Sequence, residues 1–110
     1  MPSLQPRTQM VEQQVRTWDV LDERVLDVLR DIDRAAFVPE SHRALAYADA
    51  ELPLAHGQHM LTPALVGRLL QSLAIQRTDR VLEIGAGSGF VTACLAALAR
   101  SVQSLELYAD

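Results

Sequence analysis

Three glycines directly after a short apolar segment constrain the fold of this chain more than any other feature. The segment RVLEI, residues 80–84, has the length and apolar bias of a short buried strand. The small-residue stretch 91–99 predicts a helix, and residues 102–107 predict a second strand. Strand, glycine turn, helix and strand form one βαβ unit, so the strands should be parallel and their connection right-handed. The glycines are Gly85, Gly87 and Gly89.

The residues before this unit predict a mainly helical region. Apolar side chains at helical spacing indicate two short amphipathic helices in the first thirty residues, with Asp22 as the N-cap of the second. Trp18 is expected to anchor these helices in the core or in a lid. Residues 34–57 are expected to form loops, with a helical turn near residues 42–47 and a tight turn at residues 56–57.

A further helix is predicted to begin at Thr62 and Pro63. The threonine hydroxyl can cap free backbone amides, and proline fits the first helical position without loss of a needed donor. Five apolar side chains then share one helix face. They are Leu65, Val66, Leu69, Leu70 and Leu73.

Composition and charge exclude several classes of protein. Apolar residues make up 49% and charged residues 22% of the 110 residues, which favours a folded core. The net charge of −4 argues against a nucleic-acid partner, since proteins that bind phosphates carry clustered Lys and Arg. The first ten residues lack a signal-peptide pattern, and the longest apolar stretch, residues 90–99, is far shorter than the roughly 20 residues of a membrane span. We therefore expect a cytoplasmic protein with no membrane partner.

The cysteine and histidine content predicts no metal site. Cys94 is the only cysteine, which excludes an internal disulfide and fits a reducing compartment, and we expect it to pack in the core. His42 and His56 are expected in loops or on the surface. Three scattered histidines and one cysteine do not have the spacing of metal ligands.

The glycine turn predicts a site for a nucleotide-type ligand. Glycines at the end of a strand let the backbone approach a ligand without a Cβ atom, and the next helix offers unpaired amides. The dinucleotide fingerprint is not met, because Phe90 stands where it requires a third glycine or an alanine. The Gly-Lys-Ser/Thr sequence of a phosphate-binding loop does not occur either.

Two acidic residues narrow the choice of ligand. Glu83 lies two positions before Gly85, where its carboxylate could orient a cationic group. Glu106 lies 21 residues after Gly85, at the end of the second strand, where an acidic side chain can accept hydrogen bonds from both ribose hydroxyls. A ligand with a ribose and an ammonium group but no pyrophosphate fits this arrangement. We therefore predict S-adenosyl-L-methionine as the cofactor, with Ala86 among the turn residues that contact it.

The segment EIGAGSGF, residues 83–90, resembles the first motif of class I S-adenosylmethionine-dependent methyltransferases. Upstream segments resemble the protein-L-isoaspartate O-methyltransferase family more specifically. They are residues 13–16 (QQVR), 37–39 (FVP), 52–54 (LPL) and 57–58 (GQ), followed by Pro63. The resemblance runs from about Met10 to Glu106. It implies an α/β fold in which N-terminal helices precede the first βαβ unit of a Rossmann-like class I methyltransferase sheet.

The resemblance also implies a reaction. The family transfers a methyl group from S-adenosylmethionine to the carboxylate of an L-isoaspartyl residue in a damaged protein or peptide, which is a protein repair reaction. A carboxylate is already an ionised nucleophile at neutral pH, so little general base catalysis is needed. The main task is to align the carboxylate oxygen, the methyl carbon and the sulfonium sulfur.

One segment departs from the family pattern. The family usually has Gly-Gln-Thr-Ile-Ser-x-Pro, whereas residues 57–63 have GQHMLTP, so Leu61 occupies the place of a serine whose hydroxyl lies near the methyl donor and the acceptor. Leucine cannot donate a hydrogen bond, which leaves the catalytic residues unknown. Thr62 is a candidate substitute, although a role as helix N-cap is favoured. His59 and Met60 fall in the family's ligand-contacting segment and are expected at the cofactor.

Length separates the activity of the family from the expected activity of this chain. A doubly wound sheet cannot be built from one βαβ unit, so we expect the N-terminal half of a methyltransferase. Residues 1–75 would form a helical region with a family-specific loop, and residues 76–110 the truncated first βαβ unit of the cofactor-binding domain. Alone it should be a poor enzyme, with its strands covered in a homo-oligomer or an exchanged dimer. The alternatives are a non-catalytic binding or assembly module that retains the fold, a methyltransferase with a different acceptor, and a dinucleotide-binding domain, which Phe90 disfavours.

Overall fold

The N-terminal part of the computed structural model, which describes residues 5–106, is a nearly continuous helical segment. It consists of α1 over Gln5–Met10, a π-helical turn η1 over Val11–Val15 and a 3-10 turn η2 over Arg16–Trp18. α2 follows over Glu23–Asp31, and the Asp22 side chain accepts a hydrogen bond from the first turn of this helix. The two predicted helices and the predicted N-cap are therefore confirmed.

The middle of the chain forms short turns and one small hairpin. The 3-10 helix η4 over Glu40–Leu45 overlaps the helical turn predicted near residues 42–47, whereas a second 3-10 helix, η3 over Arg34–Phe37, lies where a loop was predicted. β1 (Leu52–Pro53) and β2 (His59–Met60) pair antiparallel, which the sequence did not predict. The connection η5, Ala55–Gly57, contains two residues with left-handed φ angles, which confirms the predicted tight turn.

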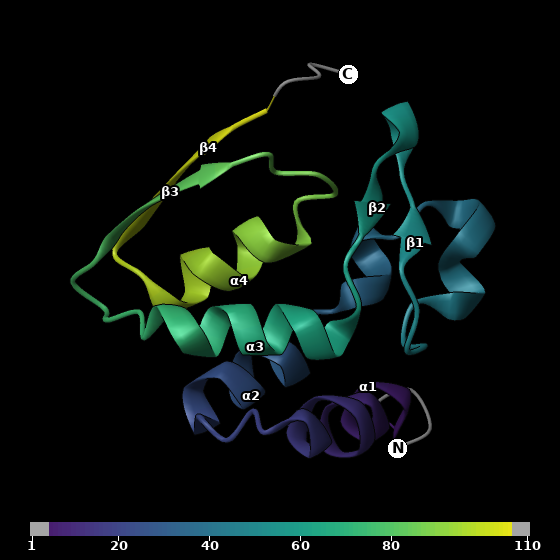
Figure 1. Ribbon diagram of the computed structural model, residues 1–110, viewed down its shortest axis with the longest axis horizontal. Helices are drawn as coiled ribbons and strands as arrows, with labels where there is room; N and C mark the ends of the chain where they lie inside the picture. The colour runs from purple at the N-terminus through teal and green to yellow at the C-terminus, as the bar shows by residue number, and fades with distance from the viewer. Residues whose placement is uncertain (1–4, 107–110) are drawn as a thin grey trace.

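The C-terminal part is the predicted βαβ unit (Figure 1). β3 over Arg80–Ile84 and β4 over Ser101–Leu105 pair in parallel, and α4 over Phe90–Leu98 connects them. α3 spans Pro63–Leu73 before this unit. Its N-cap is Thr62, whose hydroxyl accepts a hydrogen bond from a backbone N–H in the first turn, as predicted.

Helices α2, α3 and α4 pack together on one side of the β3–β4 pair (Figure 1). η1 lies so close to α3 that a Cβ atom at Gly67 would be 2.7 Å from Val15 Cγ1. Cys94 is fully buried in this aliphatic core, as predicted. Val81 and Val102 pack toward the same core, so α4 covers one face of the two-stranded sheet.

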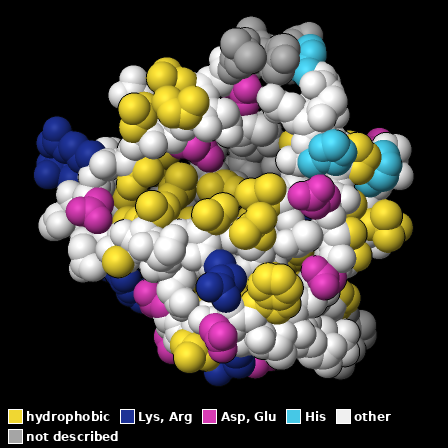
Figure 2. Space-filling model, viewed as in Figure 1, with side chains coloured by type: hydrophobic (Ala, Val, Ile, Leu, Met, Phe, Trp, Pro, Cys, Tyr) yellow, Lys and Arg dark blue, Asp and Glu magenta, His cyan; other side chains and the backbone are white. Residues whose placement is uncertain are grey.

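The other sheet face corrects the prediction of a buried strand. Leu82 and Ile84 are 60% and 73% exposed, because helices within residues 5–106 cover only one face. Of the apolar face predicted on α3, Val66 and Leu70 are buried, whereas the three leucines Leu65, Leu69 and Leu73 are exposed. Figure 2 shows hydrophobic side chains gathered on the face where these elements lie. Trp18 is also exposed, so of its two predicted positions, core or lid, the core is wrong. The valines on either side of it fill the core at this turn.

Candidate functional site

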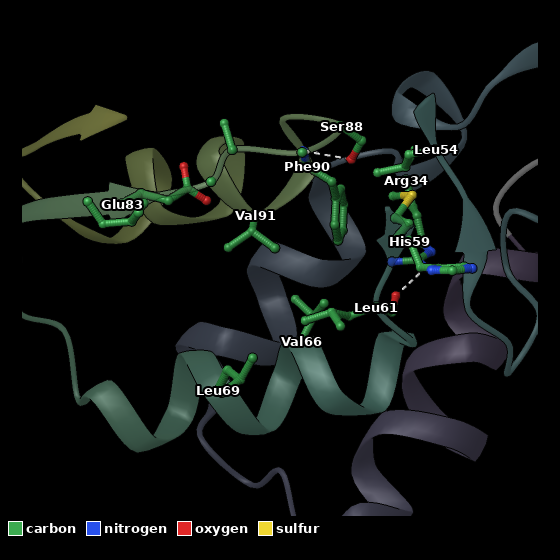
Figure 3. Close-up of a pocket in the computed structure, with 15 residues that line it drawn as sticks. Arg34, Leu54, His59, Leu61, Val66, Leu69, Glu83, Ser88, Phe90 and Val91 are labelled. Atoms are coloured by element: carbon green, nitrogen blue, oxygen red, sulfur yellow. Dashed lines mark hydrogen bonds between the residues drawn. The ribbon is translucent and has the colours of Figure 1, made fainter. Parts of the chain in front are cut away.

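A cavity of about 190 Å³ lies between the glycine turn and the segment that joins β2 to α3 (Figure 3). The turn and the start of α4 supply one wall, and the other consists mainly of apolar side chains from the segments around β2 and from α3. The volume is below the roughly 300–1,000 Å³ of typical small-molecule sites, so residues 5–106 enclose only part of a ligand as large as a nucleotide. The apolar lining includes Leu54, Met60, Leu61, Val66, Leu69 and Val91.

The glycine turn has the open backbone that the sequence predicted. Gly85, Gly87 and Gly89 have φ angles of 83°, 57° and 89°, in the left-handed region that favours glycine. A Cβ atom at Gly85 would meet no atom within 4 Å, which leaves the side facing the cavity open to a ligand. The Gly85 amide donates to the Leu105 carbonyl at 2.6 Å, so the turn begins while it is still bonded to β4.

Glu83 lines this cavity at the end of β3. Its Oε1 atom accepts hydrogen bonds from the hydroxyl of Thr92 on α4 and, at 2.7 Å, from that of Ser104 on β4. These two donors hold one carboxylate oxygen in a fixed position and leave the other for a cationic group. The predicted orienting role of Glu83 therefore has a suitable geometry.

Glu106 lies against the glycine turn from the end of β4. Its Oε2 atom accepts a hydrogen bond from the Gly87 amide at 2.7 Å. The structure thus brings together the turn and the two carboxylates that the sequence singled out. Glu106 sits at the rim, because it is exposed and does not itself line the cavity.

The four predicted site residues in the segment before α3 differ in their exposure and in whether they line the cavity. His59 is exposed and Met60 is buried, and both line the cavity. Leu61 is half-buried and also lines it, so an apolar side chain occupies this part of the wall. Thr62 does not line the cavity, and its hydroxyl accepts from the Leu65 amide at 3.3 Å. Its geometry is that of an N-cap, not of a group aimed at a ligand.

Arg34 is a residue at the cavity that sequence analysis missed. It lines the wall from η3, yet it is fully buried, and this desolvation lowers the pKa of its guanidinium to about 10. Nothing in the local pattern signals this position, because residues 34–57 have no regular apolar spacing.

The cysteine of the chain does not take part in the chemistry of the site. Burial raises the pKa of the Cys94 thiol to about 12, which leaves it protonated and unreactive. Across residues 5–106, no three His, Cys, Asp or Glu side chains are grouped so that they could hold a metal ion. None of the helices in that range has the length and apolar content needed to cross a membrane.

Comparison with known proteins gives consistent matches. Residues 5–107 match the sequence profile of the family "Protein-L-isoaspartate(D-aspartate) O-methyltransferase (PCMT)". The chain is 44% identical over 101 residues to protein-L-isoaspartate O-methyltransferase 2 of Anaeromyxobacter sp., covering 92% of this chain and 42% of the relative. It is 44% identical over 109 residues to the protein-L-isoaspartate O-methyltransferase of Methanoculleus marisnigri, covering 99% and 50%. The chain therefore spans about 40 to 50% of the length of these relatives.

The fold also matches a solved structure. The crystal structure of a beta-aspartate methyltransferase from Plasmodium falciparum, in complex with S-adenosyl-L-homocysteine, superposes with a TM-score of 0.75 at 21% identity. The match covers 94% of this chain and 50% of that one. At this identity the likeness establishes the fold, an α/β methyltransferase fold, and confirms the fold class predicted from the sequence.

Proposed function

The chain belongs to the protein-L-isoaspartate(D-aspartate) O-methyltransferase family, and from this premise we propose that its glycine turn binds S-adenosyl-L-methionine for methyl transfer to a carboxylate. The observation that carries the proposal is the contact between Glu106 and the Gly87 amide. It brings an acidic side chain to the turn at the place where ribose hydroxyls would be bound. In this proposal residues 76–110 bind the cofactor and residues 1–75 supply the opposite wall of the cavity.

The residues at the cavity fit this cofactor. Gly85 offers backbone unobstructed by a side chain, and Ala86 and Gly87 line the cavity beside it, whereas Gly89 ends the turn without lining the cavity. The free oxygen of Glu83 would accept from the ammonium group, and Glu106 from the ribose hydroxyls. When bound, the cofactor supplies a methyl group on a sulfonium. His59 and Met60 lie across the cavity and would exclude water from the opposite side.

The proposed acceptor is the carboxylate of an L-isoaspartyl residue in a protein or peptide, as in the named relatives. With the cofactor bound, an ionised carboxylate could accept its methyl group directly, and this would give a methyl ester and S-adenosyl-L-homocysteine. No proton has to move, so the walls of the cavity have to align the reactants and do not need to supply a base. We propose the cytoplasm as the compartment, which the single, buried cysteine supports.

A cofactor titration tests this proposal. S-adenosyl-L-homocysteine should bind the protein in isothermal titration calorimetry, and Glu106→Ala should weaken binding about tenfold or more, since a charged hydrogen-bond acceptor is lost. The matched control is Glu40→Ala, which removes an exposed glutamate of η4 that does not line the cavity. No heat of binding for the unmodified protein would refute the proposed cofactor site.

The apolar side chain of Leu61 favours a second candidate, a non-catalytic module that binds the cofactor without methylating isoaspartate. It lines the cavity with a group that can neither donate to nor orient a carboxylate. Incubation with an isoaspartyl peptide and labelled S-adenosyl-L-methionine separates the two. A base-labile methyl ester supports repair. Cofactor binding without ester formation supports the second candidate, provided that Leu61→Ser restores ester formation.

We further propose that copies of the chain associate through the open face of the β3–β4 pair. Its support is the exposure of Leu82 and Ile84, which is unusual for parallel strands, since these are normally covered on both faces. The family supports a protein or peptide substrate as the other partner.

A further inference from the structure

Arg34 is an exceptional residue in the part of the chain that the structure describes. Among residues 5–106 it is the one charged side chain that is fully buried, and no carboxylate lies within ion-pair distance of its guanidinium. A buried charge without a counter-charge is unfavourable unless the surroundings compensate for it. The groups that contact the guanidinium therefore show which parts of the chain Arg34 holds together.

Three contacts surround the guanidinium. Nε donates to the Ala46 carbonyl at 2.9 Å. Nη2 donates to the Leu61 carbonyl at 2.7 Å, a bond drawn in Figure 3. The guanidinium carbon lies 5.3 Å from the centroid of the Phe90 ring, a cation–π distance. That ring is in turn packed edge-on against Phe37. Both hydrogen-bond acceptors are therefore backbone carbonyls, an aromatic face adds a third contact, and the Cys94 side chain also interacts electrostatically with the guanidinium.

These contacts join the two walls of the cavity. Leu61 belongs to the segment before α3, whereas Phe90 is the first residue of α4, directly after the glycine turn. Arg34 lies between them and touches both, and both line the cavity with it. Leu61 lies 27 residues after Arg34 in the sequence, so the hydrogen bond between them holds together two segments that are far apart along the chain.

The third nitrogen of the guanidinium argues against a purely stabilising role. Nη1 is buried and makes no hydrogen bond with the described residues. An unsatisfied buried donor lowers stability, and an apolar side chain of similar volume would avoid that loss. Arg34 is therefore not the residue that would be chosen for stability alone at this position.

We propose that Arg34 is a positioning residue that sets the distance between the segment at Leu61 and the glycine turn, and thereby the width of the cavity. This inference rests on the proposed function, in which the segment at Leu61 would face the acceptor and the glycine turn would face the cofactor. Lysine cannot replace it, since an ammonium group cannot reach two carbonyls in the fixed geometry of a guanidinium or stack on the ring in the same way.

Arg34→Met tests the proposal, with Arg43→Met as its matched control. Arg43 also donates to two backbone carbonyls, those of Ala35 and Val38, but it is exposed and does not line the cavity. Hydrogen exchange of residues 58–62 reports on the segment at Leu61, and exchange of α2 reports on the fold as a whole. Calorimetric binding of S-adenosyl-L-homocysteine is the second measurement.

We expect Arg34→Met to speed exchange of residues 58–62 about fivefold or more, as expected for one lost buried hydrogen bond, and to weaken binding by a similar factor. Exchange of α2 should stay unchanged, and the control should change neither measurement by more than about twofold. Equal acceleration in α2, or unchanged exchange at residues 58–62, would overturn the proposal.

Arg34→Lys covers the case in which circular dichroism shows that the methionine variant does not fold. It keeps the charge, so wild-type exchange at residues 58–62 in this variant would also overturn the proposal. Failure of the unmodified protein to bind the cofactor product would refute the proposed function, while the exchange comparison would still decide the role of Arg34.

Discussion

At the scale of single residues, Tyr47 and Asp33 link stability to pH. The Tyr47 hydroxyl donates to Asp33 Oδ1 at 2.5 Å. This bond is the main cause that lowers the pKa of the Asp33 carboxyl, whereas burial, followed by the same contact, raises the pKa of Tyr47 to about 12. The bond joins the N-cap of η3 to the residue that follows Ala46, the C-cap of η4, whose carbonyl accepts a hydrogen bond from Arg34.

Tyr47→Phe should lower the free energy of unfolding by about 0.5–1 kcal/mol at pH 7, a modest loss because Asp33 is exposed. The folded pKa of Asp33 lies below its ordinary value of 3.8, so its contribution is present above that value and is lost as the pH falls through the folded pKa. Because the pKa of Tyr47 is raised in the folded protein, its contribution to stability is present below a pH of about 10. That contribution is lost as the pH rises toward 12. Urea unfolding of both proteins at several pH values measures the difference, and an unchanged difference at pH 2.5 would contradict the assignment.

Cys94 should be chemically silent in the folded protein. Its thiol is fully buried and its pKa is raised to about 12, so almost no thiolate exists at pH 8. Mass spectrometry after treatment with iodoacetamide at pH 8 should find no adduct, whereas the protein unfolded in urea should be alkylated fully. Rapid alkylation without urea would show that α4 opens readily or that the thiol has another position.

At the scale of elements, the contact between η1 and α3 depends on Gly67. Gly67→Ala raises helix propensity, yet the new Cβ would lie 2.7 Å from Val15 Cγ1 and 3.3 Å from Val20 Cγ2. We expect a loss of about 1–3 kcal/mol in the free energy of unfolding from this overpacking. Val15→Ala should offset part of the loss in the double variant, and Ser72→Ala, at an exposed position of the same helix, should change stability by less than about 0.5 kcal/mol. Purely additive effects in denaturant titrations would mean that η1 and α3 are not in contact there.

The elements that sequence analysis predicted well are those with local signals. The Thr62 cap, the tight turn before β2 and the glycine turn are fixed by residues within a few positions of one another, so their chemistry is visible in the sequence. β1 and β2 have two residues each, too few for an alternating pattern, and their pairing depends on the turn between them. The burial of Arg34 depends on a partner 27 residues away and was not predictable from spacing.

The same distinction holds for the site. Glu83 and Glu106 were predicted because a strand end and a glycine turn determine where their side chains lie. The need for a cover over Leu82 was predicted from the apolar sequence of the strand, but that sequence does not say which part of a molecule provides the cover.

At the scale of the whole molecule, the open face of the β3–β4 pair is an apolar surface exposed to water. Leu82, Ile84 and Leu105 are 60%, 73% and 49% exposed, and the register places Leu105 beside Ile84 on one face. Two parallel strands with one bare apolar face are marginal alone, since parallel sheets are normally covered on both sides. Contact between two such faces would remove these side chains from water and stabilise both copies by the hydrophobic effect.

Light scattering coupled to gel filtration should therefore show concentration-dependent association of the 110-residue chain. The double variant Leu82→Thr with Leu105→Thr should shift the equilibrium toward monomer by about tenfold or more, because it removes apolar area and keeps residues suited to a strand. Leu21→Thr is the matched control, as Leu21 is 64% exposed but precedes α2, away from the sheet. Neither Leu82 nor Leu105 lines the cavity, so cofactor affinity measured on the monomer should be unchanged. A wild-type chain that stays monomeric at high concentration with unchanged circular dichroism would show that this face is stable in water, and association that the control weakens equally would place the contact elsewhere.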